Sequence, residues 1–204
     1  MSSTVVVKQT KGEETRAQIL AAAVEQASRS GFESLTIGTL AEKTGMSKSG
    51  LFAHFGSKTD LQIAALDESA RRFTETVFLP ALKAPRGVKR LRALFENWLV
   101  WTRSVNLPGG CPIDAASREY DHRPGPMRDA VIERQRLVSR ELAKTVQLAI
   151  DTGELKASTD SQQVVFEFFA IVLAYYRVEF VYDKEQAMKR ARLAFDRMLD
   201  QYRS

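Results

Sequence analysis

Residues 35–61 read LTIGTLAEKTGMSKSGLFAHFGSKTDL, and this stretch decides the fold of the N-terminal part of the chain. Ala41, Gly45 and Leu51 follow one another at the spacing Ala-x3-Gly-x5-Leu. A small residue at the first position lets a second helix cross close to the first, and glycine permits the left-handed backbone of a tight turn. The leucine then fills the joint between the two helices. The spacing therefore predicts a helix-turn-helix.

The second helix of this pair, expected over residues 47–54, has the features of a reading helix. Ser47 is placed to cap its N-terminus, because a serine side chain there accepts a hydrogen bond from an amide of the first turn. Lys48, Ser49 and Gly50 occupy that first turn. In helix-turn-helix proteins the first turn of the second helix meets base edges in the major groove. The stretch thus predicts a sequence-specific DNA-binding protein.

The predicted DNA contacts are of two kinds. Lys48 is suited to donate to guanine and Ser49 to several bases, while Gly50 lets the main chain approach the duplex. Lys58, together with the amides at the start of the next helix, is suited to hold a phosphate. The predicted DNA-binding residues are Thr36, Thr39, Ser47, Lys48, Ser49, Gly50, Phe52, His54 and Lys58.

Packing and solvation offer alternatives for some of these residues. Phe52 and His54 would then only pack the small domain, and Lys48 would be an ordinary solvent-exposed lysine. Bulk charge does not decide the question, since residues 1–60 carry seven Lys and Arg against six Asp and Glu. The placement of Lys8 and Lys11 in an N-terminal arm favours a few local phosphate contacts and a modest salt dependence.

The motifs resemble the N-terminal domain of the TetR family of transcriptional regulators. The similarity covers residues 15–66 and is carried by the runs RAQILAAAVEQASRSGFESLTI and LAEKTGMSKSGLFAHFGSKTDL. The segment FAHFGSK, residues 52–58, is its most specific part. Gly38 departs from the family, which often carries a polar or basic side chain there. The resemblance implies a homodimer that binds a pseudo-palindromic operator in double-stranded DNA and responds to a small-molecule effector.

The composition of the chain indicates the general class of protein. The 204 residues carry a formal net charge of +5, and 44% of them are hydrophobic, which is enough for one domain or two small ones. No apolar run has the length of a membrane span, and the first residues, MSSTVVVKQTKGEE, do not read as a secretory signal. One cysteine and two distant histidines do not form a disulfide framework or a metal site. We expect a cytoplasmic protein with no membrane partner, metal or cofactor.

Apolar spacing and helix caps predict an all-α fold of about nine helices. Capping boxes are expected at Thr10-x-x-Glu13 and Ser57-x-x-Asp60. The expected helices cover residues 10–31, 36–43, 47–54, 57–79, 88–105, 113–119, 127–150, about 161–176, and 184–202. We expect two domains, a helix-turn-helix DNA-binding domain over residues 1–60 and a helical regulatory and dimerisation domain over residues 61–204.

The helix with the core VVFEFFAIVLAYY, residues 164–176, is apolar nearly all round, which indicates burial on both faces. One face can pack on helices of the same chain, while the other needs a partner, as in a dimer. In the TetR family the last two helices of two subunits form a four-helix interface, which implies the same here. The alternative is a central helix in a monomer. The predicted interface residues are Phe168, Val172, Phe195 and Met198.

The middle helices hold the predicted effector pocket, because large aromatic side chains mix there with a few polar groups. The same side chains can equally form ordinary core. The predicted ligand-binding residues are Phe73, Val77, Trp98, Trp101, Cys111, Tyr120 and Tyr175.

Together the helix-turn-helix and the family resemblance predict a ligand-responsive, homodimeric repressor. We do not expect an enzyme, because the sequence holds no Gly-x-Ser-x-Gly and no phosphate loop. One alternative is a DNA-binding regulator without a small-molecule effector. A second is a helical enzyme that uses Cys111 and His122 as nucleophile and base. A redox role for Cys111 is a further alternative.

Overall fold

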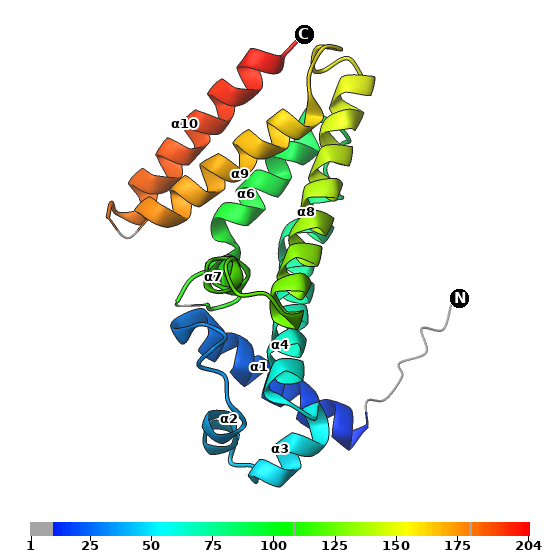
Figure 1. Ribbon diagram of the computed structural model, residues 1–204. Coiled ribbons are helices and arrows are strands. Elements are labelled where there is room, and N and C mark those ends of the chain that lie inside the picture. Colours follow the sequence, from blue (N-terminus) through cyan, green and yellow to red (C-terminus); the bar gives the residue numbers. More distant parts are fainter. Residues whose placement is uncertain (1–9, 108, 180) are drawn as a thin grey trace, which may run out of the picture. The chain divides into compact units, whose positions relative to one another are not determined.

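The computed structural model describes residues 10–107, 109–179 and 181–204 (Figure 1). Every named element in these ranges is a helix, which confirms the predicted all-α class. None of the helices in these ranges has the length and apolarity needed to cross a membrane. The elements are α1 Lys11–Ser30, α2 Ile37–Thr44, α3 Lys48–Phe55, α4 Lys58–Phe73, the π-helical η1 Thr74–Phe78, α5 Leu79–Ala81, α6 Val88–Ser104, α7 Pro112–Tyr120, α8 Pro126–Asp151, α9 Ser161–Val178 and α10 Lys184–Tyr202.

Local side-chain caps explain where several helices start. Thr10 and Glu13 form the predicted capping box of α1, in which Thr10 Oγ1 accepts from the Glu13 amide at 3.2 Å and Glu13 Oε2 accepts from the Thr10 amide at 2.7 Å. Asp160 caps α9 by accepting from the Gln162 amide, and Asp183 caps α10 by accepting from the Gln186 amide. Gly31 ends α1 with a φ of 77°, a region that favours glycine.

The segment α4–η1–α5 is one uninterrupted helical run, so the described ranges hold nine separate helical segments, as predicted. Its middle part, η1, is π-helical and therefore holds one residue more per turn than an α-helix. Val77 of η1 is buried, and its carbonyl accepts a hydrogen bond from the side chain of Asn97 in α6 at 3.0 Å. The extra residue is thus built into the packing of η1 against α6.

The described residues divide into two compact units. The first unit contains the chain up to Ser69 together with Leu107–Val131, and the second contains Ala70–Asn106 and Ile132–Ser204. α7 and the start of α8 therefore belong with α1, α2, α3 and most of α4. The predicted division at residue 60 instead assigns most of α4, α7 and α8 to the second domain. The functional division into a DNA-binding and a regulatory part stays a prediction.

The first unit has a hydrophobic core to which α7 and the start of α8 contribute. Phe32 and Leu35, in the connection between α1 and α2, are completely buried. The later part of the chain adds five buried side chains to the same core, those of Ala116, Tyr120, Met127, Ala130 and Val131. The helix-turn-helix thus rests on a core that residues far along the chain complete.

The loop before α7 is bound closely to the end of α1. Ser28 Oγ donates to the Gly110 carbonyl at 2.9 Å and accepts from the Gly109 amide at 3.2 Å. A Cβ atom on Gly109 would overlap the main-chain carbonyl of Ser28. The approach of these two main chains therefore requires glycine at position 109.

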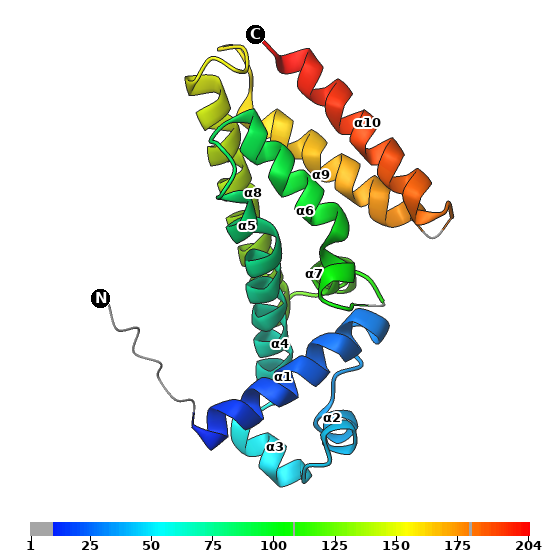
Figure 2. The ribbon, with the colours of Figure 1, turned by 180° about the vertical axis from the view of Figure 1, so that it is seen from behind.

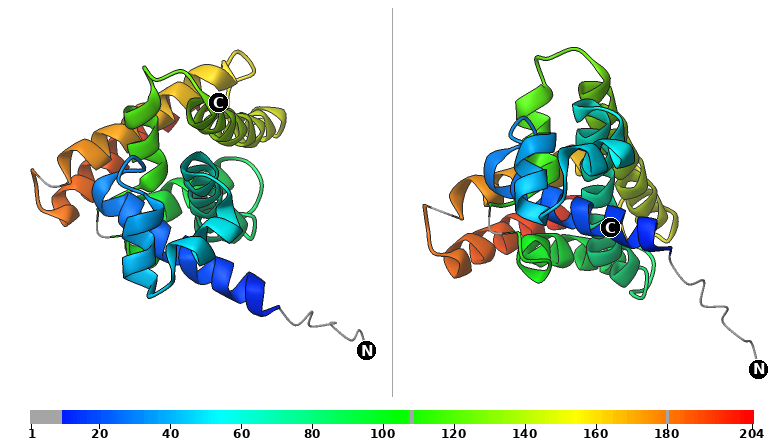
Figure 3. Two further views of the ribbon diagram at one scale, coloured as in Figure 1. Left: turned by 60° about the horizontal axis from the view of Figure 1, so that its bottom comes forward. Right: turned by 90° about the horizontal axis from the view of Figure 1, so that it is seen from below.

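The second unit is built around aromatic rings from three helices. Phe95 of α6 stacks on Phe195 of α10 with ring centroids 4.1 Å apart, and Phe168 of α9 meets both rings edge-on. α9 and α10 run side by side in all views (Figures 2 and 3). One phenylalanine from each helix thus forms the centre of this packing.

We predict that Gly109→Ala destabilises the protein by about 1–3 kcal/mol, because the added methyl group must push the loop away from α1. Gly12→Ala is the control, since among the residues that the structure describes a Cβ at this position in the first turn of α1 would meet only Thr10 Oγ1, at 4.0 Å. Urea unfolding followed by circular dichroism measures both. Equal midpoints for Gly109→Ala and wild type would show that the close approach to Ser28 is absent in solution.

Candidate nucleic-acid interface

α2 and α3 form the predicted helix-turn-helix. Gly45 between them has φ 68° and ψ 18°, the left-handed conformation expected of the tight turn. Ala41 and Leu51 are buried where the two helices meet. Ser47 caps α3 as predicted, with its Oγ accepting from the Gly50 amide at 3.1 Å. The joint and the cap together fix the direction in which the first turn of α3 points.

The first turn of α3 presents its side chains to solvent. Lys48 and Ser49 are exposed, and Gly50 is half-buried beneath them. Phe52 is 52% exposed, which argues against the alternative that it only packs the domain. His54 is half-buried with its ring 6.3 Å from that of Phe55, so its predicted DNA contact stays a prediction. α3 thus offers a cation, a hydroxyl and an exposed ring on one short helix.

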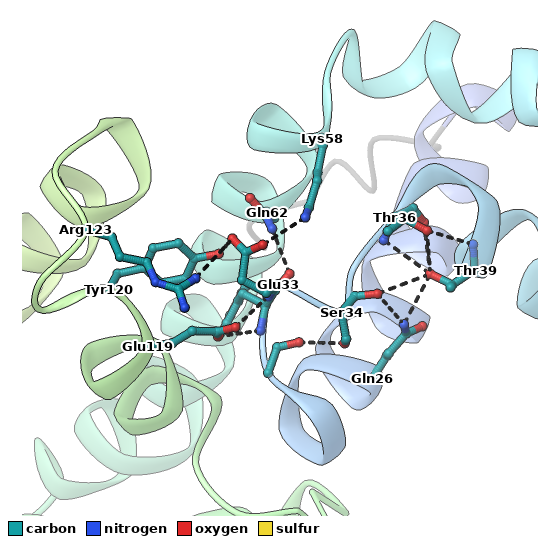
Figure 4. Close-up of polar contacts among 12 residues, drawn as sticks. Gln26, Glu33, Ser34, Thr36, Thr39, Lys58, Gln62, Glu119, Tyr120 and Arg123 are labelled. Carbon is teal, nitrogen blue, oxygen red and sulfur yellow. Dashed lines mark hydrogen bonds and ion pairs between the residues drawn. The ribbon is translucent and has the colours of Figure 1, made fainter.

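Thr36 and Thr39 have a structural role at the start of α2. Thr36 Oγ1 accepts from the Thr39 amide at 3.1 Å, and Thr39 Oγ1 accepts from the Thr36 amide at 3.2 Å. The side chain of Gln26 in α1 also donates to Thr39 Oγ1 at 3.2 Å (Figure 4). Both hydroxyls are therefore engaged in a capping box, and their predicted contact with the DNA backbone stays a prediction.

Gly38 leaves space beside the predicted base-reading lysine. A Cβ atom on Gly38 would lie 3.8 Å from Lys48 Cε, which is ordinary van der Waals contact. A longer side chain at this position would share the space of the Lys48 side chain. The glycine that departs from the resembled family thus leaves the space beside the end of the Lys48 side chain open.

Lys58 is placed at the N-terminus of α4, as predicted, but it already has an anionic partner. Its Nζ donates to Glu33 Oε2 at 3.0 Å (Figure 4). Nearby, Ser57 Oγ accepts from the Asp60 amide at 3.1 Å and donates to Asp60 Oδ2 at 2.6 Å. A phosphate that approaches Lys58 must therefore compete with Glu33.

Glu33 collects three partners from different parts of the first unit. Besides Lys58, Tyr120 of α7 donates its hydroxyl proton to Glu33 Oε1 at 2.8 Å, and the Arg123 guanidinium lies 3.9 Å from the same oxygen. The hydrogen bond from Lys58 lowers the pKa of Glu33 most, and the hydrogen bond from Tyr120 is the second cause of this lowering. Burial, followed by the hydrogen bond to Glu33, raises the pKa of Tyr120. Glu33 is therefore ionised and Tyr120 protonated near neutral pH.

Glu119, at the end of α7, binds two main-chain amides of the connection between α1 and α2. Its Oε2 accepts from the Phe32 amide at 2.7 Å and its Oε1 from the Glu33 amide at 2.8 Å (Figure 4). Sequence analysis missed Glu119 and Glu33, and it assigned Tyr120 to the effector pocket. The hydroxyl of Tyr120 is directed at Glu33 within the first unit, and the assignment of Tyr120 to the effector pocket stays a prediction.

The remaining predicted pocket residues divide between the two units. Phe73, Val77, Trp98, Trp101 and Tyr175 are buried in the second unit. Cys111, by contrast, belongs to the first unit and caps α7, with its Sγ accepting from the Asp114 amide at 3.4 Å. The seven predicted residues are thus drawn from both units, and their role as one effector pocket stays a prediction.

The aromatic side chains in the second unit contact one another directly. Phe73 meets Trp98 and Trp101 edge-on, with centroid distances of 4.7 Å and 5.2 Å. Both indole N–H groups donate to the hydroxyl of Tyr176, at 3.0 Å and 2.9 Å. Tyr175 donates to the Leu99 carbonyl at 2.9 Å. These buried polar groups are satisfied within the cluster.

The structure does not favour the catalytic alternative. Cys111 is engaged as a helix cap, and the exposed His122 lies beside Asp121 at 3.6 Å. Among the described residues, no group of three or more His, Cys, Asp and Glu is arranged to hold a metal ion.

The predicted dimer residues need correction. Phe168, Val172, Phe195 and Met198 are all buried within one chain, so a second copy cannot reach them. The exposed apolar side chains of the same helices are different ones. The large ones are Phe166 (69% exposed) and Leu173 (51%) on α9, and Leu193 on α10.

Two family models match the chain. The model described as bacterial regulatory proteins, tetR family, matches residues 19–65. The model described as tetracyclin repressor-like, C-terminal domain, matches residues 87–195, more than half of the chain. Comparison with curated proteins gives no match.

Solved structures share the fold. A TetR-family regulator from Cytophaga hutchinsonii aligns with a TM-score of 0.83 at 16% identity, over 97% of this chain and 98% of that chain. One from Chloroflexus aurantiacus aligns with a TM-score of 0.82 at 23% identity, over 93% and 94%. AibR, in complex with isovaleryl coenzyme A and operator DNA, aligns with a TM-score of 0.69 at 20% identity, over 92% and 97%.

The pKa of Glu33 predicts a pH-dependent contribution to stability. Because its folded-state pKa lies below its ordinary value of 4.5, the stabilisation is complete above that value and is lost as the pH falls through the folded-state pKa. The difference in urea midpoint between wild type and Glu33→Gln should therefore shrink as the pH falls from about 7 to about 3. Glu42→Gln, on the exposed side of α2, is the control for charge. A difference that stays constant with pH would contradict the contacts seen at Glu33.

Proposed function

Since this chain belongs to the TetR family of DNA-binding transcriptional regulators, which is not a family of enzymes, we propose that it is a homodimeric repressor that a small molecule releases from its operator. The observation that carries the proposal is the first turn of α3, capped by Ser47 and exposed at Lys48 and Ser49. We place the protein in the cytoplasm, together with the operator DNA that it would bind. AibR, which shares the fold, was solved with both an acyl coenzyme A and operator DNA.

DNA recognition would place α3 in the major groove. The Lys48 ammonium donates to the acceptor atoms of guanine, and the Ser49 hydroxyl serves as donor or acceptor to a neighbouring base. Phe52, exposed on the next turn, lies against the sugar-phosphate wall. Lys58 binds a phosphate at the N-terminus of α4, where the amides of the first turn add their partial positive charge.

Dimerisation would use the outer faces of α9 and α10. Phe166 and Leu173 are seven residues apart and therefore lie on the same side of α9, with exposed Ala170 between them. Leu193 and Ala194 extend the apolar surface onto α10. A second copy that covers this surface by two-fold symmetry makes a self-complementary contact and presents two reading helices to an operator.

Effector binding is proposed for the aromatic cluster of the second unit. A small molecule acts on DNA binding only through a difference in its affinity for the two arrangements of the dimer. Phe73, Trp98 and Trp101 supply apolar walls, and the hydroxyl of Tyr176 supplies a polar group. The direct ring contacts also favour a second candidate, a regulator without a small-molecule effector, because they already fill the space between these side chains.

The two predicted lysine contacts are expected to differ in kind. Lys48→Ala should cost about 1–3 kcal/mol of binding to a duplex selected by the wild-type protein and reduce sequence preference. Lys58→Ala should weaken binding to all sequences alike and lower the salt slope by about 1. Lys83→Ala removes the same charge from the second unit and serves as the control. If both variants bind like Lys83→Ala in fluorescence anisotropy, α3 is not the reading helix.

The proposed interface is tested with two matched leucines. Leu173→Glu and Phe166→Glu should give monomers at micromolar concentration and weaken operator binding by about 100-fold, since the two reading heads are no longer linked. Leu137→Glu places the same charge on a leucine of α8 that is 50% exposed and should leave the dimer intact. Sedimentation measures assembly. A wild-type monomer, or a dimer that survives both α9 substitutions, would exclude this interface.

Intrinsic fluorescence reports on the proposed effector site, because Trp98 and Trp101 are the two tryptophans of the chain. A small molecule that releases the protein from DNA should change their emission at the concentration that causes release. Isovaleryl coenzyme A, the ligand of AibR, is a defined first compound to titrate. A compound that releases DNA and leaves the emission unchanged would place the effector site elsewhere.

A further inference from the structure

The phosphate-binding lysine of the proposed interface is held by a carboxylate of its own unit. Lys58 Nζ lies 3.0 Å from Glu33 Oε2, and both side chains are partly exposed to solvent. We propose that Glu33 competes with DNA phosphate for Lys58, and that Tyr120 and Arg123 weaken this competition by binding the same carboxylate. This inference rests on the proposed phosphate contact of Lys58.

The two oxygens of the Glu33 carboxylate bind different partners at the same time. Lys58 binds Oε2, whereas the Tyr120 hydroxyl donates to Oε1 at 2.8 Å and Arg123 approaches Oε1 at 3.9 Å. Donors on Oε1 compensate part of the negative charge that attracts Lys58. When they are present, Lys58 leaves Glu33 more readily, because Glu33 keeps other partners. When they are absent, Lys58 is the main counter-charge of Glu33 and stays with it.

α7 fixes Glu33 by its main chain as well as by its side chain. Glu119 accepts from the Glu33 amide at 2.8 Å, and Tyr120, the next residue, binds the Glu33 carboxylate. Any change that draws the end of α7 away from the connection between α1 and α2 breaks both bonds together. Lys58 would then be left to Glu33, and affinity for phosphate would fall. All of these contacts lie within the first unit.

Tyr120 is thus a positioning residue: it binds Glu33, and Glu33 in turn controls how readily Lys58 can bind a DNA phosphate. Tyr120→Phe removes the hydroxyl and keeps the buried ring, so the core of the unit is retained. It should weaken binding to duplex DNA by about two- to fivefold, the size expected of one partly exposed ion pair. Glu33→Gln should tighten binding by a similar factor. In the Glu33→Gln background, Tyr120→Phe should have no further effect.

The measurement uses the full chain and a labelled duplex of arbitrary sequence, because a phosphate contact does not depend on base sequence. Binding is measured by fluorescence anisotropy over a range of salt concentrations. Glu33→Gln is compared with Glu42→Gln, which removes the same charge from the exposed side of α2. Tightening by Glu33→Gln should exceed that by Glu42→Gln and should disappear when Lys58→Ala is added.

Each outcome decides between the claims. Failure of the wild-type protein to bind any duplex at low salt would overturn the proposed function and the inference with it. Binding that Lys58→Ala leaves unchanged would remove the phosphate contact and the inference, while the DNA-binding function stands. If Lys58→Ala weakens binding but Tyr120→Phe has the same effect with and without Glu33, Tyr120 is only structural and the inference is wrong. Urea unfolding of each variant verifies that the fold is retained.

Discussion

The first unit depends on one carboxylate that binds two main-chain amides. The connection between α1 and α2 places Phe32 in the core, and the Phe32 amide needs an acceptor because an unpaired amide at a buried position is costly. The amide of Glu33, the exposed next residue, binds the same carboxylate. Glu119 supplies both acceptors from the end of α7. The helix-turn-helix starts at Ile37, four residues after Glu33, so the position of α2 depends on a residue more than eighty positions later in the chain.

The same constraint explains the glycines and small residues around α7. The loop before it approaches the end of α1 so closely that position 109 admits no side chain, and Ser28 uses both hydrogen-bonding capacities of its hydroxyl on this loop. Tyr120 then combines an apolar ring in the core with a hydroxyl on Glu33. The side chain of Tyr120 therefore links the packing of the core to the charge balance at Glu33, so that a shift of its ring also moves its hydroxyl.

Sequence reasoning succeeded where structure is local. The capping box at Thr10, the cap at Ser47 and the turn at Gly45 each depend on residues a few positions apart, so their spacing was sufficient to predict them. It failed where partners are distant, as with Glu33 and Tyr120, which no periodicity relates. It also failed on α9, because a helix that is apolar on all sides does not reveal which side its own chain covers. Phe168 was predicted for the interface and is buried in the subunit, whereas Phe166 is the exposed one.

The π-helical turn η1 makes the number of residues in this segment part of the structure. A π-turn holds about one residue more than the α-helical turn that would replace it, so deletion of one residue between Thr74 and Phe78 can convert η1 into α-helix while the parts before and after it keep their angular phase. Ala81, buried in α5, would then keep its place against α6. In a helix without such a turn, loss of one residue rotates everything that follows by about 100°. A change in length by one residue is thus tolerated at η1, where an ordinary α-helical turn can take its place.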